Sequence, residues 1–221
     1  MRTWMKCYHV FLSQWWLKAL VYILYPVVMI GGMCLAILIV KSQGAGITLA
    51  YNLTGNLFIM AELFLGYFIF GGVAAKDSNK LEYLKTSVRG MSVLKRGIIV
   101  DALRRALGIY LMLLVPLFLC GGHLNSSIWV ACAVVILCSE AGLIIFRRTS
   151  SFTIFIVVLV LSGTVGGAVM AIGMICSNFW WAVALFYVVT AAVTVCSIRM
   201  VMQKARESYY DAGFENKLEA A

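Results

Sequence analysis

The sequence predicts an all-α integral membrane protein with six transmembrane helices. Of its 221 residues, 63% are hydrophobic and 12% are charged, whereas soluble domains are about 45–50% apolar and about 25% charged. Apolar runs of the ~20 residues that cross a bilayer recur six times along the chain. The long polar interval between them, at 76–105, is strongly basic. Together these observations exclude an ordinary soluble domain.

The first residues, 1–18, predict an amphipathic helix that lies in the membrane interface. Trp4, Tyr8, Phe11 and Trp15 recur at spacings of three and four, which places them on one face of a helix. Polar residues break the apolar part and no small-residue cleavage site follows, so the segment does not have the pattern of a signal peptide. The alternative is a basic, aromatic flank of the first transmembrane helix.

The six apolar runs are interpreted as transmembrane helices. In the third run, Asp101, Arg104 and Arg105 fall in the first turns. We expect this helix to begin in water or among headgroups and to enter lipid near Ala106. The predicted spans are 19–40, 55–75, 98–120, 128–146, 152–176 and 179–198.

The distribution of lysine and arginine predicts the orientation. If the N-terminus is cytoplasmic, the inner segments hold nearly all of the basic residues, including Arg147 and Arg148 after the fourth run and those of the tail at 199–221, and the outer connections hold Lys41 alone. This asymmetry obeys the positive-inside rule and predicts that both termini are cytoplasmic. The net charge of +9 has the same explanation, so we expect no nucleic-acid partner.

Part of the basic interval has the pattern of a short amphipathic helix. Leu81, Leu84 and Val88 recur at three and four and form an apolar stripe. Asn79 is suited to cap the start of this helix and Gly90 to end it. An exposed helix with an apolar stripe needs a partner, either lipid headgroups or a protein groove.

Two acidic residues, Glu62 and Glu140, lie inside predicted spans. An ionised carboxylate in the membrane costs several kcal/mol unless it is paired, hydrated or protonated. One interpretation is a polar lining or a proton or cation site in a translocation pathway. The other is an acid that holds helices together, with Ser139 or Asn56 as a hydrogen-bonding neighbour. The sequence leaves both open.

The fifth run carries Gly163 and Gly167 four residues apart. Small residues at this spacing allow two membrane helices to approach closely, so we expect helix packing here. A broken helix in which residues 163–178 re-enter the membrane is the alternative.

Sequence motifs for catalysis or metal binding are absent. The chain contains no GxxxxGK[ST] phosphate loop, no HExxH and no GxSxG. Its cysteines and histidines do not have zinc-site spacing. We therefore expect no catalytic residue, no metal ligand and no cofactor on this chain.

The order of these elements, with Glu82-Tyr-Leu-Lys-Thr-Ser-Val-Arg-Gly-Met-Ser-Val-Leu-Lys-Arg after the second span, resembles permease subunits of ABC-type 2 exporters. The resemblance implies that residues 1–18 form the elbow helix and that the loop 76–97 holds a coupling helix. This helix would dock in a groove of a separate ATPase subunit, which carries ATP and magnesium. The residues implied in coupling are Leu81, Glu82, Tyr83, Leu84, Lys85, Val88 and Arg89.

The resemblance also implies that two permease chains, identical or different, pair in a bacterial cell membrane. The loop departs from the family pattern because its turn, Thr86-Ser-Val, has no proline. We expect a transporter subunit that exports a hydrophobic or amphipathic molecule such as a peptide, lipid or drug-like compound. The alternatives are a substrate-binding membrane subunit of a vitamin-uptake system and a membrane assembly or immunity protein without cargo.

Overall fold

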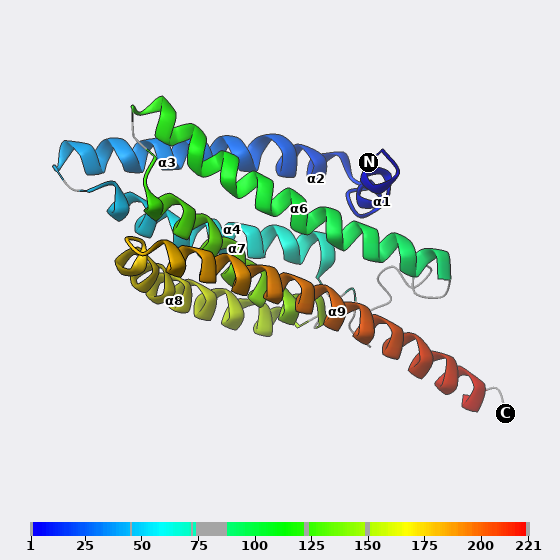
Figure 1. Cartoon of the computed structure of the whole chain (residues 1–221). Coiled ribbons are helices and arrows are strands. Elements are labelled where there is room, and N and C mark those ends of the chain that lie inside the picture. Colours follow the sequence, from blue (N-terminus) through cyan, green and yellow to red (C-terminus); the bar gives the residue numbers. More distant parts are fainter. Residues whose placement is uncertain are drawn as a thin grey trace.

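The computed structural model describes residues 2–44, 46–71, 73, 88–121, 124–148 and 151–219. The regular elements in these residues are all helical, which confirms the all-α class (Figure 1). They are α1 (Arg2–Phe11), α2 (Trp15–Ala19), a π-helical segment η1 (Leu20–Leu24), α3 (Tyr25–Ser42), α4 (Ile47–Phe70), α6 (Val88–Leu119), α7 (Ser126–Arg148), α8 (Phe152–Cys176) and α9 (Trp180–Glu219).

Within the described residues, five helices are long and apolar enough to cross a membrane. This supports the prediction of a multi-pass membrane protein. The long helix α6 is not one of the five, so the sixth span stays a prediction. The five spans are Trp15–Ser42, Ile47–Phe70, Ser126–Arg148, Phe152–Cys176 and Trp180–Glu207.

Three helices extend well beyond the predicted runs. Helix α4 begins at Ile47, eight residues before the predicted start, α6 begins at Val88, ten residues before it, and α9 continues well beyond residue 198. Helix α8 is continuous from Phe152 to Cys176, so residues 163–176 do not form a broken, re-entrant segment. Between α3 and α4, Gly44 has a φ of 67°, a left-handed conformation that glycine adopts without strain.

The helices lie side by side as an elongated bundle with α7 at its centre (Figure 1). Helix α7 packs against α4, α6, α8 and α9, and its residues from Val130 to Ile136 are all buried. Side chains on the outer faces of α3, α8 and α9 are apolar and exposed, such as Leu35, Val160 and Val188. Such faces suit contact with lipid tails.

Helix α1 packs on the start of α6. Tyr8 and Phe11 are buried, and the Phe11 ring lies 4.7 Å from that of Phe70 on α4, measured between centroids. A side chain at Gly97 of α6 would clash with Phe11. Much of the aromatic face that was predicted to lie among headgroups therefore contacts protein, whereas Trp15 is exposed.

The predicted coupling helix lies mostly outside the described residues, and this applies to Leu81, Glu82, Tyr83, Leu84 and Lys85. Its last two members, Val88 and Arg89, belong to the first turn of α6. Gly90 is inside the same helix, so the prediction that a helix ends at Gly90 is wrong.

Candidate functional site: a buried ionic cluster

Charged residues from α4, α6 and α7 meet at one level of the bundle. Glu62 lies eight residues before the end of α4 at Phe70, and Glu140 lies eight residues before the end of α7 at Arg148. At 1.5 Å per residue, each acid is ~12 Å from that end of its helix. We call the six charged residues at this level the ionic cluster: Glu62, Asp101, Arg104, Arg105, Glu140 and Arg147.

Arg105 is the centre of the ionic cluster because it contacts all three carboxylates. Its Nη2 lies 2.5 Å from Asp101 Oδ2, and its Nε lies 3.2 Å from Glu62 Oε2. Its Nη1 donates to Glu140 Oε1. One guanidinium thereby joins α6 to α4 and to α7, using its planar set of donors.

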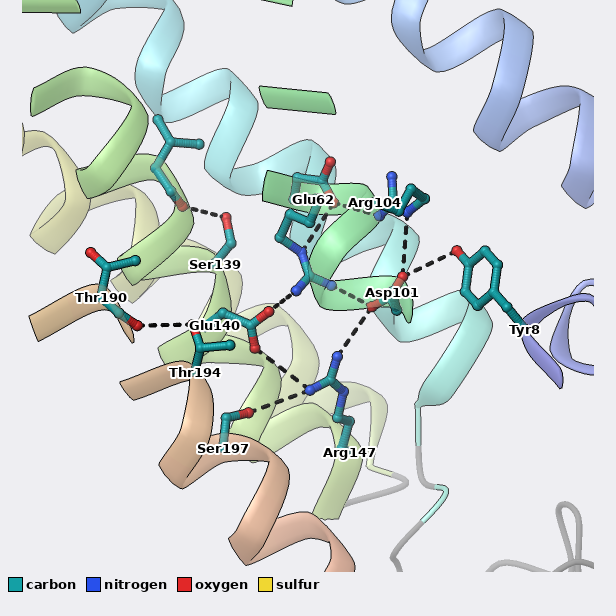
Figure 2. A network of polar contacts seen from close by, with 12 residues as sticks. Tyr8, Glu62, Asp101, Arg104, Ser139, Glu140, Arg147, Thr190, Thr194 and Ser197 are labelled. Carbon is teal, nitrogen blue, oxygen red and sulfur yellow. Dashed lines mark hydrogen bonds and ion pairs between the residues drawn. The ribbon is translucent and has the colours of Figure 1, made fainter. Parts of the chain in front are cut away.

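The other two arginines lie on either side of Arg105. Arg104 Nη2 is 2.9 Å from Glu62 Oε2, and its Nε is 3.4 Å from Asp101 Oδ1. On the opposite side, Arg147 Nη2 is 3.1 Å from Asp101 Oδ2 and its Nη1 is 3.6 Å from Glu140 Oε2 (Figure 2). Arg147 makes the longest ion-pair contacts of the three arginines, and its guanidinium carbon lies 5.6 Å from the centre of the Phe70 ring.

The ionic cluster is electrically balanced, with three carboxylates against three guanidinium groups. Five of the six side chains are at most 1% exposed, and Arg104 is 14% exposed. An isolated charge at such a position would be very costly, whereas opposite charges in contact offset much of that cost. The pairing explains how six ionisable residues are accommodated in a bundle that is otherwise apolar.

Two hydroxyl groups connect the ionic cluster to the outer helices. The Tyr8 hydroxyl of α1 donates to Asp101 Oδ1 at 3.1 Å, and Arg147 Nη1 donates to Ser197 Oγ of α9 at 3.4 Å. Burial, followed by the nearby Asp101 carboxylate, raises the pKa of Tyr8 well above its usual value near 10. Tyr8 therefore keeps the proton that it donates at neutral pH.

The sequence singled out Glu62 and Glu140, but it misplaced their partners. Asp101 and Arg105 were expected in water or among headgroups, and Arg147 was counted with the cytoplasmic loop charges. All three are fully buried. One feature of the sequence does indicate a pairing. Asp101 and Arg105 are four residues apart, a spacing that places opposite charges together on a helix face.

The hydrogen-bonding neighbours that were expected for the acids do not bond to them in the described structure. Ser139 donates to the Val135 carbonyl at 2.7 Å. The Asn56 side chain lies beside Gly167, where an added Cβ atom would be 2.9 Å from Asn56 Nδ2. The arginines, rather than these two residues, compensate the acids in the described structure.

The predicted small-residue face of α8 lies against α4. A Cβ atom at Gly163 would clash with Met60 Cε, and one at the intervening Gly166 would lie 2.6 Å from Ile59 Cδ1. The absence of side chains at these positions allows α8 to approach α4 closely. Met60 and Glu62 belong to the same helix, so this contact helps to hold the helix that carries the first acid of the ionic cluster.

Among the described residues, no group of three or more histidine, cysteine, aspartate or glutamate side chains is arranged to hold a metal ion. The carboxylates of the ionic cluster contact arginines instead.

Comparisons with protein families, with curated proteins and with solved structures find no match for this chain. The arrangement is thus that of a helical membrane protein with a charged core.

Proposed function

We propose that this chain is the transmembrane subunit of an ATP-driven transporter of the ABC-type 2 kind, exporting a hydrophobic or amphipathic molecule. The observation that carries the proposal is the position of α6. This helix begins at Val88, within the last residues of the predicted coupling helix that docks on the ATPase (the docking segment), and its residues Asp101 and Arg105 bond to α4 and α7.

Helix α6 is suited to transmit movement. From Val88 to Asp101 it extends ~20 Å as a continuous helix. A displacement of the start of α6 would be transmitted to the ionic cluster, where Arg105 links α6 to α4 and α7. The hydrogen bonds within these ion pairs are directional, so we expect a small shift of α6 to exchange partners more readily than it stretches every contact. Arg147, whose ion pairs are the longest, is the member best placed for such an exchange.

The remaining parts of the proposal follow from the resemblance and the charge distribution. ATP and magnesium bind to a separate ATPase subunit, and a second permease chain completes the pathway. Both termini lie in the cytoplasm of a bacterial cell, on the side of the basic segment 76–97. The chain itself has no hydrolytic role.

Purification of the full chain from its native cells tests the docking step. An ATPase of the ABC class should co-purify in a fixed ratio, and the complex should hydrolyse ATP. Leu84→Asp and Tyr83→Ala should each remove the ATPase. Ser92→Asp is the matched control because Ser92 is an exposed residue of α6, and it should retain the ATPase. Full retention of the ATPase after Leu84→Asp would contradict the prediction that the docking segment binds it.

A second experiment tests the ionic cluster in transport. Amphipathic peptides or lipids should stimulate ATP hydrolysis by the reconstituted complex, and Glu62→Gln and Glu140→Gln should each weaken that stimulation because each leaves an arginine unbalanced. Unchanged stimulation in both variants would exclude a role for the two acids. A tightly bound vitamin in the purified chain would instead favour the uptake-system alternative, and a stable chain without any ATPase would favour an assembly or immunity protein.

A further inference from the structure

A groove of about 850 Å³ runs between α1, the η1–α3 segment and α6. Arg104 belongs both to the lining of this groove and to the ionic cluster. Its wall on α6 includes Leu107 and Leu111, which are 62% and 60% exposed, although both are large apolar residues. A surface of this kind favours an apolar occupant.

The groove is long enough to hold a lipid tail across one leaflet of a bilayer. Its wall on α6 runs from Val100 to Val115, which is ~22 Å along the helix. Half of the ~30 Å hydrocarbon core is ~15 Å. A lipid tail that entered at the Val100 end would therefore fit within the groove over the depth of one leaflet.

One end of the groove is basic and aromatic. Among the described residues that line it, Arg104 is the charged one, and its charge is offset by Glu62 and Asp101 of the ionic cluster. Arg104 uses Nε and Nη2 to contact the ionic cluster, and within the described residues its Nη1 has no hydrogen-bond partner. Because Arg104 is 14% exposed, this nitrogen is available to an acceptor at the end of the groove.

A second cation extends the same face of α6. Arg96 is eight residues before Arg104, or ~12 Å along the helix. Its guanidinium carbon lies 5.9 Å from the ring centre of Trp4, a residue that lines the groove. Tryptophan and arginine together are typical of the headgroup level of a membrane protein.

We infer that this groove binds one anionic phospholipid of the surrounding bilayer, with an acyl chain along Leu107 and Leu111 and its phosphate at the end formed by Arg104 and Arg96. The apolar wall accounts for the tail, the positive charge of Arg96 accounts for the negative headgroup, and Arg104 supplies a further hydrogen-bond donor. This binding needs no ATPase partner and stands apart from the proposed transport role.

Native mass spectrometry of the purified full chain tests this inference. The chain in detergent micelles is titrated with phosphatidylglycerol or with phosphatidylcholine of identical acyl chains. We expect one phosphatidylglycerol to be retained at a concentration about fivefold lower than phosphatidylcholine, a preference of the size that one basic residue gives near an anionic surface.

Filling the groove should remove this lipid. A Cβ atom at Gly108 would have Met112 Cε at 3.6 Å as its nearest neighbour, so Gly108→Leu adds its side chain without a backbone clash. Gly31→Leu is the matched control, because a Cβ there meets nothing within 4 Å and Gly31 does not line the groove. Leu111→Trp provides a second filling variant should Gly108→Leu fail to fold, as judged by circular dichroism.

The headgroup preference is tested separately. Arg96→Ala should lower the affinity for phosphatidylglycerol about fivefold and leave phosphatidylcholine unchanged, whereas Lys95→Ala, an exposed neighbour outside the groove, should preserve the preference. Equal retention of the two lipids by the unaltered chain would overturn the inference. Retention of the lipid by a folded filling variant, or a change of oligomeric state in place of lipid loss, would also overturn it.

Discussion

Arg105 Nη1 of α6 donates to Glu140 Oε1 of α7 inside the bundle, although 35 positions separate the two residues in the chain. The same guanidinium contacts Glu62 and Asp101. Buried ion pairs add little net stability compared with well-packed apolar residues, but the loss of one partner is strongly destabilising. We therefore expect the ionic cluster to help fix the register of α4, α6 and α7.

The central position of Arg105 predicts that its replacement is the most damaging single change in the ionic cluster. Arg105→Met removes one positive charge and leaves three carboxylates against two arginines. We expect the free energy of unfolding in bicelles to fall by about 3–5 kcal/mol. Arg148→Met, at the exposed neighbour of Arg147, should change it by less than about 0.5 kcal/mol. Similar effects of the two variants would contradict the structure.

The hydrogen bond from Tyr8 to Asp101 predicts that α1 depends on the ionic cluster. Tyr8→Phe keeps the buried ring but removes a donor to a charged carboxylate, which should lower the free energy of unfolding by about 1.5–3 kcal/mol. Tyr22→Phe is the control because the Tyr22 hydroxyl contacts the exposed His9. Limited proteolysis should cut near α1 faster in Tyr8→Phe alone, and equal rates in both variants would be evidence against the link.

The approach of α8 to α4 predicts sensitivity to size at the small-residue face. Gly163→Leu and Gly167→Leu introduce atoms where Met60 and Asn56 already lie, and overpacking of this kind costs about 1–3 kcal/mol. Gly31→Leu, which points into open space, should leave the midpoint of thermal unfolding unchanged or raise it, because leucine favours helix more than glycine. A loss of stability in the control equal to that in the two variants would refute this packing.

The prediction that α6 crosses the membrane has a direct test. Its two ends should lie on opposite sides of the bilayer. In a variant without native cysteines, Leu124→Cys, just beyond α6, should react with a membrane-impermeant maleimide in intact cells. Ser92→Cys should react only after the membrane is opened. Reaction of both residues from the same side would show that α6 does not span the membrane.

The sequence was sufficient for the class of the protein because class depends on composition and on the lengths of apolar runs. The bounds predicted for the fifth run, 152–176, coincide with those of α8. The start of α4 was missed because polar residues between Ile47 and Thr54 interrupt the apolar pattern. The Thr54 hydroxyl donates to the Ala50 carbonyl at 2.7 Å, and such a bond within the helix lets a polar residue lie in an apolar environment.

The sequence alone does not predict which residues pair with one another in the ionic cluster. Whether Arg147 lies in a loop or in the core depends on which helix packs beside α7 and in which register. The positive-inside rule assigns Arg147 to a cytoplasmic loop together with Arg148, and Arg148 is indeed exposed. The rotation of α7 directs Arg147 toward Asp101 instead, and only the packed bundle reveals this direction.

The most direct measurement of the role assigned to the ionic cluster is a double-mutant cycle on Arg105 and Glu140. Arg105→Met and Glu140→Met each leave one unbalanced charge, whereas the double variant leaves two carboxylates and two arginines. The free energies of unfolding in bicelles should therefore be non-additive, with the double variant about 2 kcal/mol or more stable than the sum of the single losses predicts. Additive losses would show that the two residues do not compensate each other inside the bundle, and would contradict the contact between Arg105 and Glu140.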